Sequence, residues 1–363
     1  MRIMYCIPTL EHGGAERQLS YLALELARKG HEIHVVFLRD GANLGRMRAG
    51  GVATHRLPAG GNHDPKIFLG LLRLIRKIRP DIIQTSLPQM DVLGGAAALT
   101  TGTRWVLKES SSAPAYPAHW KSSLRASLTK RADAIVSNSQ AGDAYWGAKG
   151  GAPPRYVIPN GLPLDEIAAA QPAPAPADLR FEPDEKLLLY AGRMDSGKNV
   201  ETLIVALSRV ANEVPLTALL CGDGVLKPRL EGLAAELGLK HRVVFSGYVS
   251  NLWALMKRAD AFAFLSRFEG CPNVVLEAMA CGCPLIVSDI PAHREILDDR
   301  SACFVDPDEP EAIAEALTTT LLFGDAARAR AVAAQAKVAE RTIGGMAERY
   351  EQLYLGVIES GSA

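Results

Sequence analysis

Apolar runs of strand length alternate with helix-like segments along the chain, and this alternation limits the fold more than any other feature. It begins with the run at residues 2–8 and the helical pattern at 15–30, then restarts with KLLLYAG at 186–192 and NVETLIVALSRVANEV at 199–214. The runs are continuous in Val, Ile and Leu, which is typical of parallel sheets covered by helices on both faces. We therefore expect an α/β protein with two Rossmann-like, doubly wound parallel-sheet domains facing across a cleft.

The length of 363 residues is sufficient for two domains. An Ala- and Pro-rich stretch, AAAQPAPAPADLRFEPDE, separates the two halves of the pattern and reads as an extended spacer. The expected organisation is a basic N-terminal Rossmann-like domain at 1–165, a linker at 166–185 and a C-terminal Rossmann-like domain at 186–345. A last helix at 346–363 is expected to cross back to the N-terminal domain.

The two halves carry opposite charge although the whole chain is neutral. Residues 1–170 contain 21 Lys and Arg against 13 Asp and Glu, whereas residues 171–363 contain 19 against 27. A basic domain suits an anionic surface, either nucleic acid or a membrane leaflet. Because no nucleic-acid-binding motif accompanies the charge, we expect a membrane surface and no nucleic acid partner.

Other classes are disfavoured by the absence of their signatures. No apolar run approaches the length of a transmembrane helix, and the N-terminus lacks the pattern of a secretory signal. The six cysteines show no ordinary zinc spacing and are expected to be free thiols. The sequence therefore predicts a cytoplasmic protein with no metal, and the basic first half favours peripheral attachment at the inner face of the membrane.

Charged residues follow the strand-like runs of the second half. Arg193 and Lys198 come after KLLLYAG and just before a helix, where two cations suit a diphosphate, although a solvated loop is the ordinary alternative. Further along, Glu269 and Glu277 lie on either side of a helix start marked by Pro272. A helix start binds anions through free N–H groups, and the flanking carboxylates suit hydroxyl groups.

Taken in order, these motifs resemble the retaining glycosyltransferases of family 4. The matching stretches are GRMDSGKN at 192–199, CGDG at 221–224, the two glutamates with EAMACG at 269–282, GGAER at 13–17 and IPNG at 158–161. The likeness spans essentially the whole chain and implies the GT-B fold. It also implies that the C-terminal domain binds a nucleotide-sugar donor, with UDP favoured, and that the N-terminal domain binds a lipid-linked or oligosaccharide acceptor.

The resemblance also implies roles for individual residues. Arg193 and Lys198 would bind the diphosphate and stabilise the leaving nucleotide, as catalytic residues together with Glu269, which would contact the donor sugar. Glu277 would accept hydrogen bonds from the ribose hydroxyls. The other residues expected to bind the donor lie in glycine loops and at the helix start: Gly13, Gly14, Gly222, Gly270, Cys271, Asn273 and Val274. The expected transfer retains the anomeric configuration and needs no metal or other cofactor.

One departure from the family concerns the first domain. Many relatives carry a histidine after a strand where this chain reads WVLKESSSAPAYP, so Glu109 and His12 are candidates for a catalytic or acceptor contact, whereas His119 is expected to be structural. Asp306-Pro307-Asp308 is expected to be a surface turn and not a metal site. Two alternatives stay open: a sugar-nucleotide epimerase of the same shape, and a non-catalytic binding protein.

The segment KIFLGLLRLIRKIR at 66–79 is amphipathic. It predicts a helix that packs its apolar stripe on the sheet and leaves a basic back in solvent, and this back could meet anionic lipid without inserting. A second basic segment, HWKSSLRASLTKRAD, points in the same direction.

Overall fold

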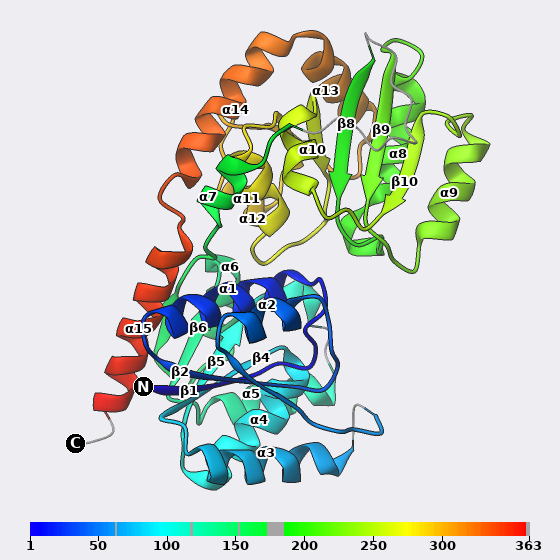
Figure 1. Cartoon of the computed structure of the whole chain (residues 1–363). Coiled ribbons are helices and arrows are strands. Elements are labelled where there is room, and N and C mark those ends of the chain that lie inside the picture. Colours follow the sequence, from blue (N-terminus) through cyan, green and yellow to red (C-terminus); the bar gives the residue numbers. More distant parts are fainter. Residues whose placement is uncertain (62–63, 117–118, 152, 173–184, 361–363) are drawn as a thin grey trace. The chain divides into compact units, whose positions relative to one another are not determined.

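The computed structural model describes residues 1–61, 64–116, 119–151, 153–172 and 185–360. The chain forms two compact units, Met1–Gly161 with Arg341–Ala363, and Leu162–Glu340 (Figure 1). Each unit is built on a parallel sheet with helices between its strands, which confirms the predicted α/β class with two Rossmann-like domains. Most of the predicted linker lies at 173–184, outside the described residues.

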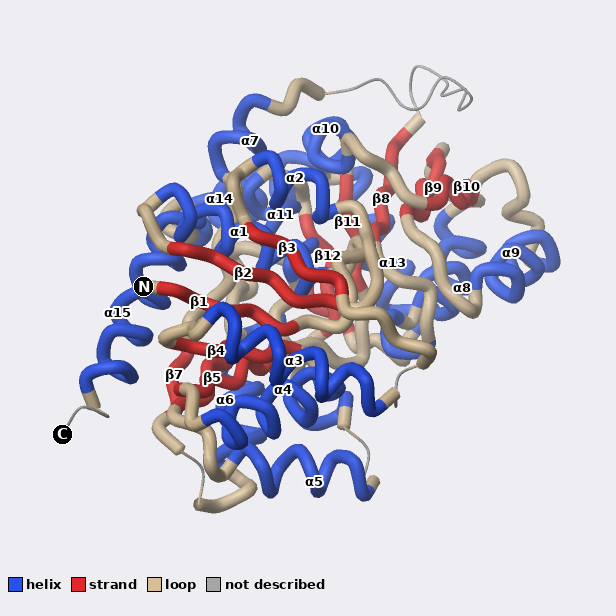
Figure 2. The backbone as a smooth tube through the Cα atoms, turned by 60° about the horizontal axis from the view of Figure 1, so that its bottom comes forward, coloured by secondary structure: helices blue, strands red, loops and turns tan. Residues whose placement is uncertain are grey.

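The first sheet has seven parallel strands in the order β3-β2-β1-β4-β5-β6-β7, seen side by side in Figure 2. The strands are β1 Arg2–Cys6, β2 Glu32–Phe37, β3 Ala53–Arg56, β4 Ile82–Ser86, β5 Arg104–Glu109, β6 Ala134–Ser137 and β7 Arg155–Val157. The helices of this unit are α1 Gly14–Arg28, α2 Asn43–Ala49, α3 Pro65–Ile78, α4 Pro88–Thr101, α5 Trp120–Thr129, α6 Gln140–Gly147 and α15 Ile343–Glu359, with a 3-10 turn at Ala113–Ala115.

Alternate residues of β1 enter two separate apolar cores, one on each face of the sheet. Ile3 and Tyr5 pack in the core that includes residues of α1 and α15, whereas Met4 and Cys6 pack in the core that includes residues of α3 and α4. This alternation follows from the two-residue side-chain period of a strand. It explains why the strands are continuously apolar, as the sequence predicted.

The C-terminal helix belongs to the first unit. Helix α15 lies beside α1 (Figure 1). Its Tyr354 hydroxyl donates to Gln84 Oε1 on β4 at 2.6 Å and lies 3.2 Å from the Tyr5 hydroxyl on β1. These buried polar contacts fix the helix on the sheet, because an unpaired polar group at this depth would be costly.

The second sheet has six parallel strands in the order β10-β9-β8-β11-β12-β13. The strands are β8 Lys186–Ala191, β9 Leu216–Cys221, β10 Val243–Gly247, β11 Ala261–Phe264, β12 Leu285–Ser288 and β13 Cys303–Val305. The helices of this unit are α7 Leu164–Ala169, α8 Val200–Val210, α9 Lys227–Glu236, α10 Leu252–Arg258, α11 Asn273–Ala280, α12 Pro291–Arg294, α13 Pro310–Leu322 and α14 Gly324–Val338, with a 3-10 turn at Ser196–Lys198.

Strand β8 marks the point where the order of the second sheet reverses. The chain runs outward from β8 through β9 to β10, then returns to place β11 on the other side of β8. The loops after β8 and β11 therefore follow the carboxyl ends of two neighbouring strands at this switch point. In doubly wound sheets this is the place where ligands bind.

Candidate functional site

The loop after β8 is fixed by its own side chains. The Tyr190 hydroxyl donates to the carbonyl oxygen of Arg193 at 2.9 Å. The Asp195 carboxylate caps the 3-10 turn by accepting from the amides of Gly197 at 3.1 Å and Lys198 at 3.2 Å. Asn199 then takes a left-handed conformation, with φ at 54°, where the chain enters α8. This sequence of turns defines the position from which the Lys198 side chain begins.

Lys198 and Glu269 meet at the switch point of the second sheet. The Lys198 ammonium lies 2.5 Å from Glu269 Oε1, so the loop after β8 is joined to the loop after β11. The ammonium also lies 5.3 Å from the centre of the Phe264 ring. The side chains are 18% and 11% exposed, respectively, so the pair is shielded from bulk water but still reachable. The sequence predicted both residues, and the fold brings them together.

Arg193 shows the opposite behaviour to Lys198. Its side chain is 80% exposed, and its guanidinium is 3.4 Å from Asp195 Oδ2. An exposed pair at this distance is weak. The guanidinium is therefore able to turn toward an anion without a large cost.

Glu277 is held inside the second unit at helix α11. The residue is 1% exposed, and its Oε2 accepts from Trp253 Nε1 at 3.0 Å. Burial, and secondarily the Glu277 carboxylate, raises the pKa of the nearby Cys281 thiol to about 12, so Cys281 stays a neutral thiol. The structure thus places a fixed acceptor one turn into the helix.

Helix α11 begins as predicted, at Asn273 after Pro272, and no side chain caps its first turn. Gly270 is buried before the helix, whereas Cys271, Asn273 and Val274 are half-buried. An uncapped helix start favours anions through its N–H groups and its dipole. Four of the residues expected to bind the donor, Gly270, Cys271, Asn273 and Val274, therefore lie at the start of this helix.

Position 222 requires a glycine because the backbone at Gly192 lies very close to it. Its φ is 129°, and a Cβ at this position would lie 2.0 Å from the Gly192 carbonyl oxygen. A Cβ on Gly224 would likewise lie 2.4 Å from the Met194 carbonyl oxygen. The turn after β9 packs directly on the loop that leads to Lys198, which explains both glycines without a ligand. Donor contact by Gly222 stays a prediction.

The glycine loop of the first unit begins helix α1. Gly13 precedes the helix, and a Cβ on it would lie 2.1 Å from Glu16 Oε2. Glu16 itself accepts from the Thr9 hydroxyl at 2.7 Å. Gly14 is the first helical residue and is exposed, as is His12. The contacts predicted for these three residues with donor or acceptor stay predictions.

Glu109 lies at the end of β5 and is fully buried. Its Oε1 accepts from the Ser110 and Ser111 amides, each at 2.9 Å, and from the Tyr116 hydroxyl at 2.6 Å. Its Oε2 accepts from Arg125 Nη2 at 2.8 Å and from Trp146 Nε1 at 3.1 Å. Both oxygens are thus occupied by the chain, an arrangement that suits a structural carboxylate better than a general base.

Arg125 ties this carboxylate to a second one. Its Nε donates to Asp91 Oδ2 at 2.7 Å, and its guanidinium lies over the Tyr116 and Trp146 rings. We call Asp91, Glu109 and Arg125 the buried triad. Burial, opposed by Arg125 and reinforced by Glu109, raises the pKa of Asp91 to about 6.

Sequence reasoning missed several residues that shape these clusters. In the first unit these are Asp91, Tyr116 and Trp146, and in the second they are Phe264, Trp253 and His293. Each lies outside the element that holds its partner, so no local motif announced it. The only available signal was polar or aromatic residues within apolar segments. Arg125 was expected among the surface cations of the basic segment HWKSSLRASLTKRAD, and this was wrong, because its guanidinium is buried between Asp91 and Glu109.

The Asp306-Pro307-Asp308 segment forms the predicted turn. Asp306 Oδ1 accepts from the Asp308 amide at 2.9 Å, and Asp308 pairs with Arg267. The Pro307 carbonyl oxygen accepts from Asn199 Nδ2 at 2.6 Å. The turn therefore braces the Lys198 loop. Among the described residues, no cluster of His, Cys, Asp or Glu has the arrangement of a metal site.

Helix α3 buries its apolar stripe on the first sheet. The stripe residues Ile67, Leu71 and Ile75 belong to the core on that face. Packing of the apolar stripe on the sheet is therefore observed, and contact of the basic back of the helix with anionic lipid stays a prediction. Within the described residues, no helix is both long and apolar enough to cross a bilayer.

Two family models match the chain. One, described as Glycosyl transferases group 1, matches residues 174–337, and the other, described as Glycosyl transferase 4-like domain, matches residues 13–161. The two matches fall in the second and the first unit, respectively.

Curated relatives are similar over parts of the chain. A Campylobacter jejuni N-acetylgalactosamine-N,N'-diacetylbacillosaminyl-diphospho-undecaprenol 4-alpha-N-acetylgalactosaminyltransferase is 37% identical over 38% of this chain and 38% of its own length. A D-inositol 3-phosphate glycosyltransferase of Xylanimonas cellulosilytica is 34% identical over 52% and 48%. A second Campylobacter jejuni alpha-1,4-N-acetyl-D-galactosaminyltransferase, named for an undecaprenol-linked acceptor, is 26% identical over 77% of each chain. The chain thus spans under half the length of the first two relatives.

Solved structures share the fold. HepE from Anabaena, in complex with UDP-glucose, superposes with a TM-score of 0.86 at 21% identity, covering 98% of this chain and 100% of that one. Sucrose-phosphate synthase from Thermosynechococcus elongatus gives 0.85 at 22% identity, covering 99% and 100%.

Proposed function

We propose that this chain, in which a glycosyltransferase group 1 domain and a glycosyltransferase 4-like domain are both present, is a transferase that uses a nucleotide-sugar donor. It moves the sugar to a hydroxyl of a lipid-linked or glycan acceptor and retains the anomeric configuration. UDP-sugars are the favoured donors, supported by the UDP-glucose complex of a protein with the same fold.

One observation carries this proposal: the Lys198–Glu269 pair stands at the switch point of the second sheet, with the exposed Arg193 on the same loop as Lys198. Two cations and a carboxylate match the parts of a sugar nucleotide. The cations suit its diphosphate, and the carboxylate suits the hydroxyls of its sugar. The uncapped start of α11 adds a further site for negative charge.

The chemical role of the cations follows from where charge develops. Breaking the anomeric C–O bond leaves positive charge on the sugar ring and negative charge on the departing diphosphate. Lys198 and Arg193 stabilise the departing diphosphate, and the stabilisation is greatest in the transition state because negative charge grows on the diphosphate as the bond breaks. Lys198 gives up part of its contact with Glu269 to do so, which frees Glu269 to accept from a sugar hydroxyl.

Glu277 binds the other end of the donor in this proposal. Its carboxylate is buried and oriented by Trp253, so it is preset to accept hydrogen bonds from the ribose hydroxyls. Because the carboxylate is already oriented, binding of the two ribose hydroxyls requires little rearrangement of the protein. In this proposal, other groups select the nucleotide base.

Retention and independence from metal are separate parts of the proposal, each with its own measurement. The anomeric coupling constant of the first product, read by NMR before any equilibration, is expected to match the configuration of the donor sugar. Turnover is expected to persist in excess EDTA, because Arg193 and Lys198 supply the positive charge that a divalent metal supplies elsewhere. An inverted product, or loss of turnover in EDTA that added Mg²⁺ restores, would remove the corresponding part.

The first unit offers a surface for a membrane-borne acceptor at the inner leaflet. Trp120 and Leu124 lie one turn apart on α5 and are 65% and 40% exposed. Lys121 stands over the Trp120 ring, and residues 119–132 contain no Asp or Glu. Exposed apolar side chains among cations are typical of surfaces that bind anionic lipid. Vesicles with phosphatidylglycerol should bind the chain at low salt and release it at high salt. Trp120→Ser should weaken the binding at low salt, and equal binding by the variant would contradict this.

The deciding experiment is a donor panel. The purified chain is incubated with UDP-, GDP- and ADP-sugars and an undecaprenyl-diphosphate-linked glycan, and free nucleotide and product are measured. Transfer releases nucleoside diphosphate and extends the acceptor. A new sugar nucleotide without free diphosphate would indicate an epimerase, and neither product, together with no donor-induced rise in melting temperature, would indicate a different function.

A further inference from the structure

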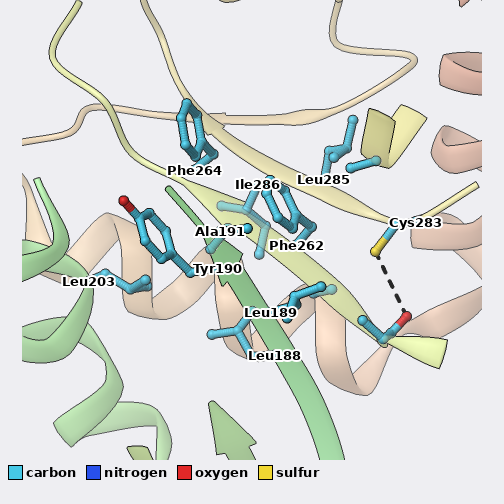
Figure 3. Packing of buried hydrophobic residues seen from close by; sticks show 14 of the residues in the cluster. Leu188, Leu189, Tyr190, Ala191, Leu203, Phe262, Phe264, Cys283, Leu285 and Ile286 are labelled. Atoms are coloured by element: carbon cyan, nitrogen blue, oxygen red, sulfur yellow. Dashed lines mark hydrogen bonds between the residues drawn. The ribbon is translucent and has the colours of Figure 1, made fainter. Parts of the chain in front are cut away.

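A column of side chains stands behind the Lys198 ammonium. The ammonium lies 5.3 Å from the centre of the Phe264 ring, and that ring lies 6.0 Å from the imidazole of His293 at an angle of 62°. His293 Nδ1 lies 2.8 Å from the Ser288 carbonyl oxygen at the end of β12. Figure 3 shows the Phe264 end of the column beside Tyr190, which stacks on the same ring at 6.0 Å.

His293 is fixed as a neutral ring. It is fully buried on α12, and burial lowers the pKa of its imidazole. Because Nδ1 faces a carbonyl oxygen, which only accepts, Nδ1 carries the proton and Nε2 carries the lone pair. Within the described part of the chain, Nε2 has no hydrogen-bond partner although it is buried.

The surroundings explain why the ring must stay neutral. The charged groups that act on it are Glu269, Lys198 and Asp289. A second cation at this position would repel the Lys198 ammonium and would draw Glu269 away from it. A neutral ring does neither, and it supports the aromatic face on which the ammonium rests.

We propose that His293 is a positioning residue for the donor site: held by the Ser288 carbonyl, it fixes the Phe264 ring and thereby sets where the Lys198 ammonium meets the diphosphate. This inference rests on the proposed function, because it acts through Lys198. It assigns a role to a residue that no motif of the sequence singled out, and it makes Phe264 the link between the two.

The proposal predicts a specific pattern of UDP affinity in the full chain. Removing the imidazole with His293→Asn keeps an N–H that can reach Ser288 and removes the ring that supports Phe264. UDP affinity, measured by calorimetry, should fall about five- to tenfold, a size typical of a displaced charged contact. Phe264→Leu should have a similar effect, and it keeps the proposal testable if His293→Asn folds poorly.

A double-mutant cycle separates positioning from general damage. In a Lys198→Ala background, His293→Asn and Phe264→Leu should each change UDP affinity by less than about twofold, since the group they place is gone. Thr320→Val, which alters another buried polar residue of the same unit, serves as the matched control and should leave affinity unchanged. Thr320 lies on α13.

Each outcome has a defined meaning. Equal losses in the wild-type and Lys198→Ala backgrounds, or unchanged affinity in both His293→Asn and Phe264→Leu, would overturn the positioning role. If Lys198→Ala itself leaves UDP affinity unchanged, the proposed donor site fails, and the failure is then distinct from that of the inference about His293.

Discussion

Each of the two units contains a cluster of cations and carboxylates near the end of a strand. The two sheets begin with the same strand order, but the two clusters differ in how deeply they are buried. In the first unit Arg125 joins Glu109 and Asp91 with side chains 2%, 0% and 0% exposed. In the second, Lys198 joins Glu269 with side chains 18% and 11% exposed. Similar chemistry is closed inside one unit and reachable in the other.

The difference in burial assigns different roles to the two clusters. A fully desolvated triad has its hydrogen bonds directed inward, and its loss should destabilise the fold. A shielded but reachable pair can exchange partners with a ligand. Glu109 and Glu269 both resembled catalytic carboxylates in the sequence, and only the packing around them distinguishes the two.

The largest effect should come from opening the buried triad. Arg125→Met leaves the Asp91 and Glu109 charges without compensation, so the free energy of unfolding should fall by about 3–5 kcal/mol. Urea denaturation measures it. Arg104→Met is the control: it breaks a partly exposed pair with Asp133 in the same unit and should cost about 1 kcal/mol or less. Equal losses would mean that burial does not set the difference.

The next effect concerns activity. Lys198→Ala should lower kcat by about 10²–10³-fold, because it removes charge stabilisation of the departing diphosphate. The melting temperature should change little. The matched control is Lys186→Ala, which breaks the ion pair between Lys186 and Asp260. Lys186 lies at the start of β8, and the Lys198 loop follows the other end of this strand. Near-normal turnover in Lys198→Ala, or an equal loss in the control, would contradict the role of the pair.

The pH dependence of stability gives a third prediction, on the triad. The pKa of Asp91 is raised to about 6 in the folded chain and lies near 3.8 in the unfolded one. The folded chain therefore binds this proton more tightly, so the contribution of Asp91 is present below about pH 4 and is lost as the pH rises to about 6. The stability difference between wild type and Asp91→Asn should fall by about 3 kcal/mol from pH 4 to pH 7. A difference that rises with pH would contradict the assignment.

The smallest effect should come from the turn that braces the Lys198 loop. Arg267 donates to Asp308 and also to the Ser196 carbonyl oxygen at 3.2 Å. Because this pair is exposed, Asp308→Ala should raise the donor KM by no more than about fivefold. Asp299→Ala, which breaks an exposed pair with Arg294 in the same unit, should leave KM unchanged. A larger effect from the control would remove the bracing role.

The sequence was sufficient to predict the parallel sheets and the candidate site residues Lys198 and Glu269 of the second unit. Continuous apolar runs predicted parallel strands, and Pro272 predicted where α11 begins, because each signal lies within a few residues. Lys198 and Glu269 followed from their positions after strands. Their contact could be expected only because β8 and β11 are neighbours in a doubly wound sheet.

The remainder depended on packing between distant segments. Glu109 looked like a replacement for a missing histidine, but its side-chain partners come from α5, from α6 and from Tyr116 in the loop after β5. Gly222 looked like a ligand contact, and the backbone at Gly192 explains it. His293, on α12, gave no signal, since its importance arises from its contacts with Phe264 on β11 and Ser288 on β12. A local sequence pattern predicts the secondary structure of a segment, but it does not predict which distant residues that segment contacts.

A crystal structure of the chain with UDP bound tests the central claim most directly. We predict diphosphate oxygens within hydrogen-bond distance, about 3 Å, of Lys198 Nζ and the Arg193 guanidinium at the carboxyl ends of β8 and β11. UDP bound at another position, with the Lys198–Glu269 pair undisturbed and no ligand at that edge, would contradict the account.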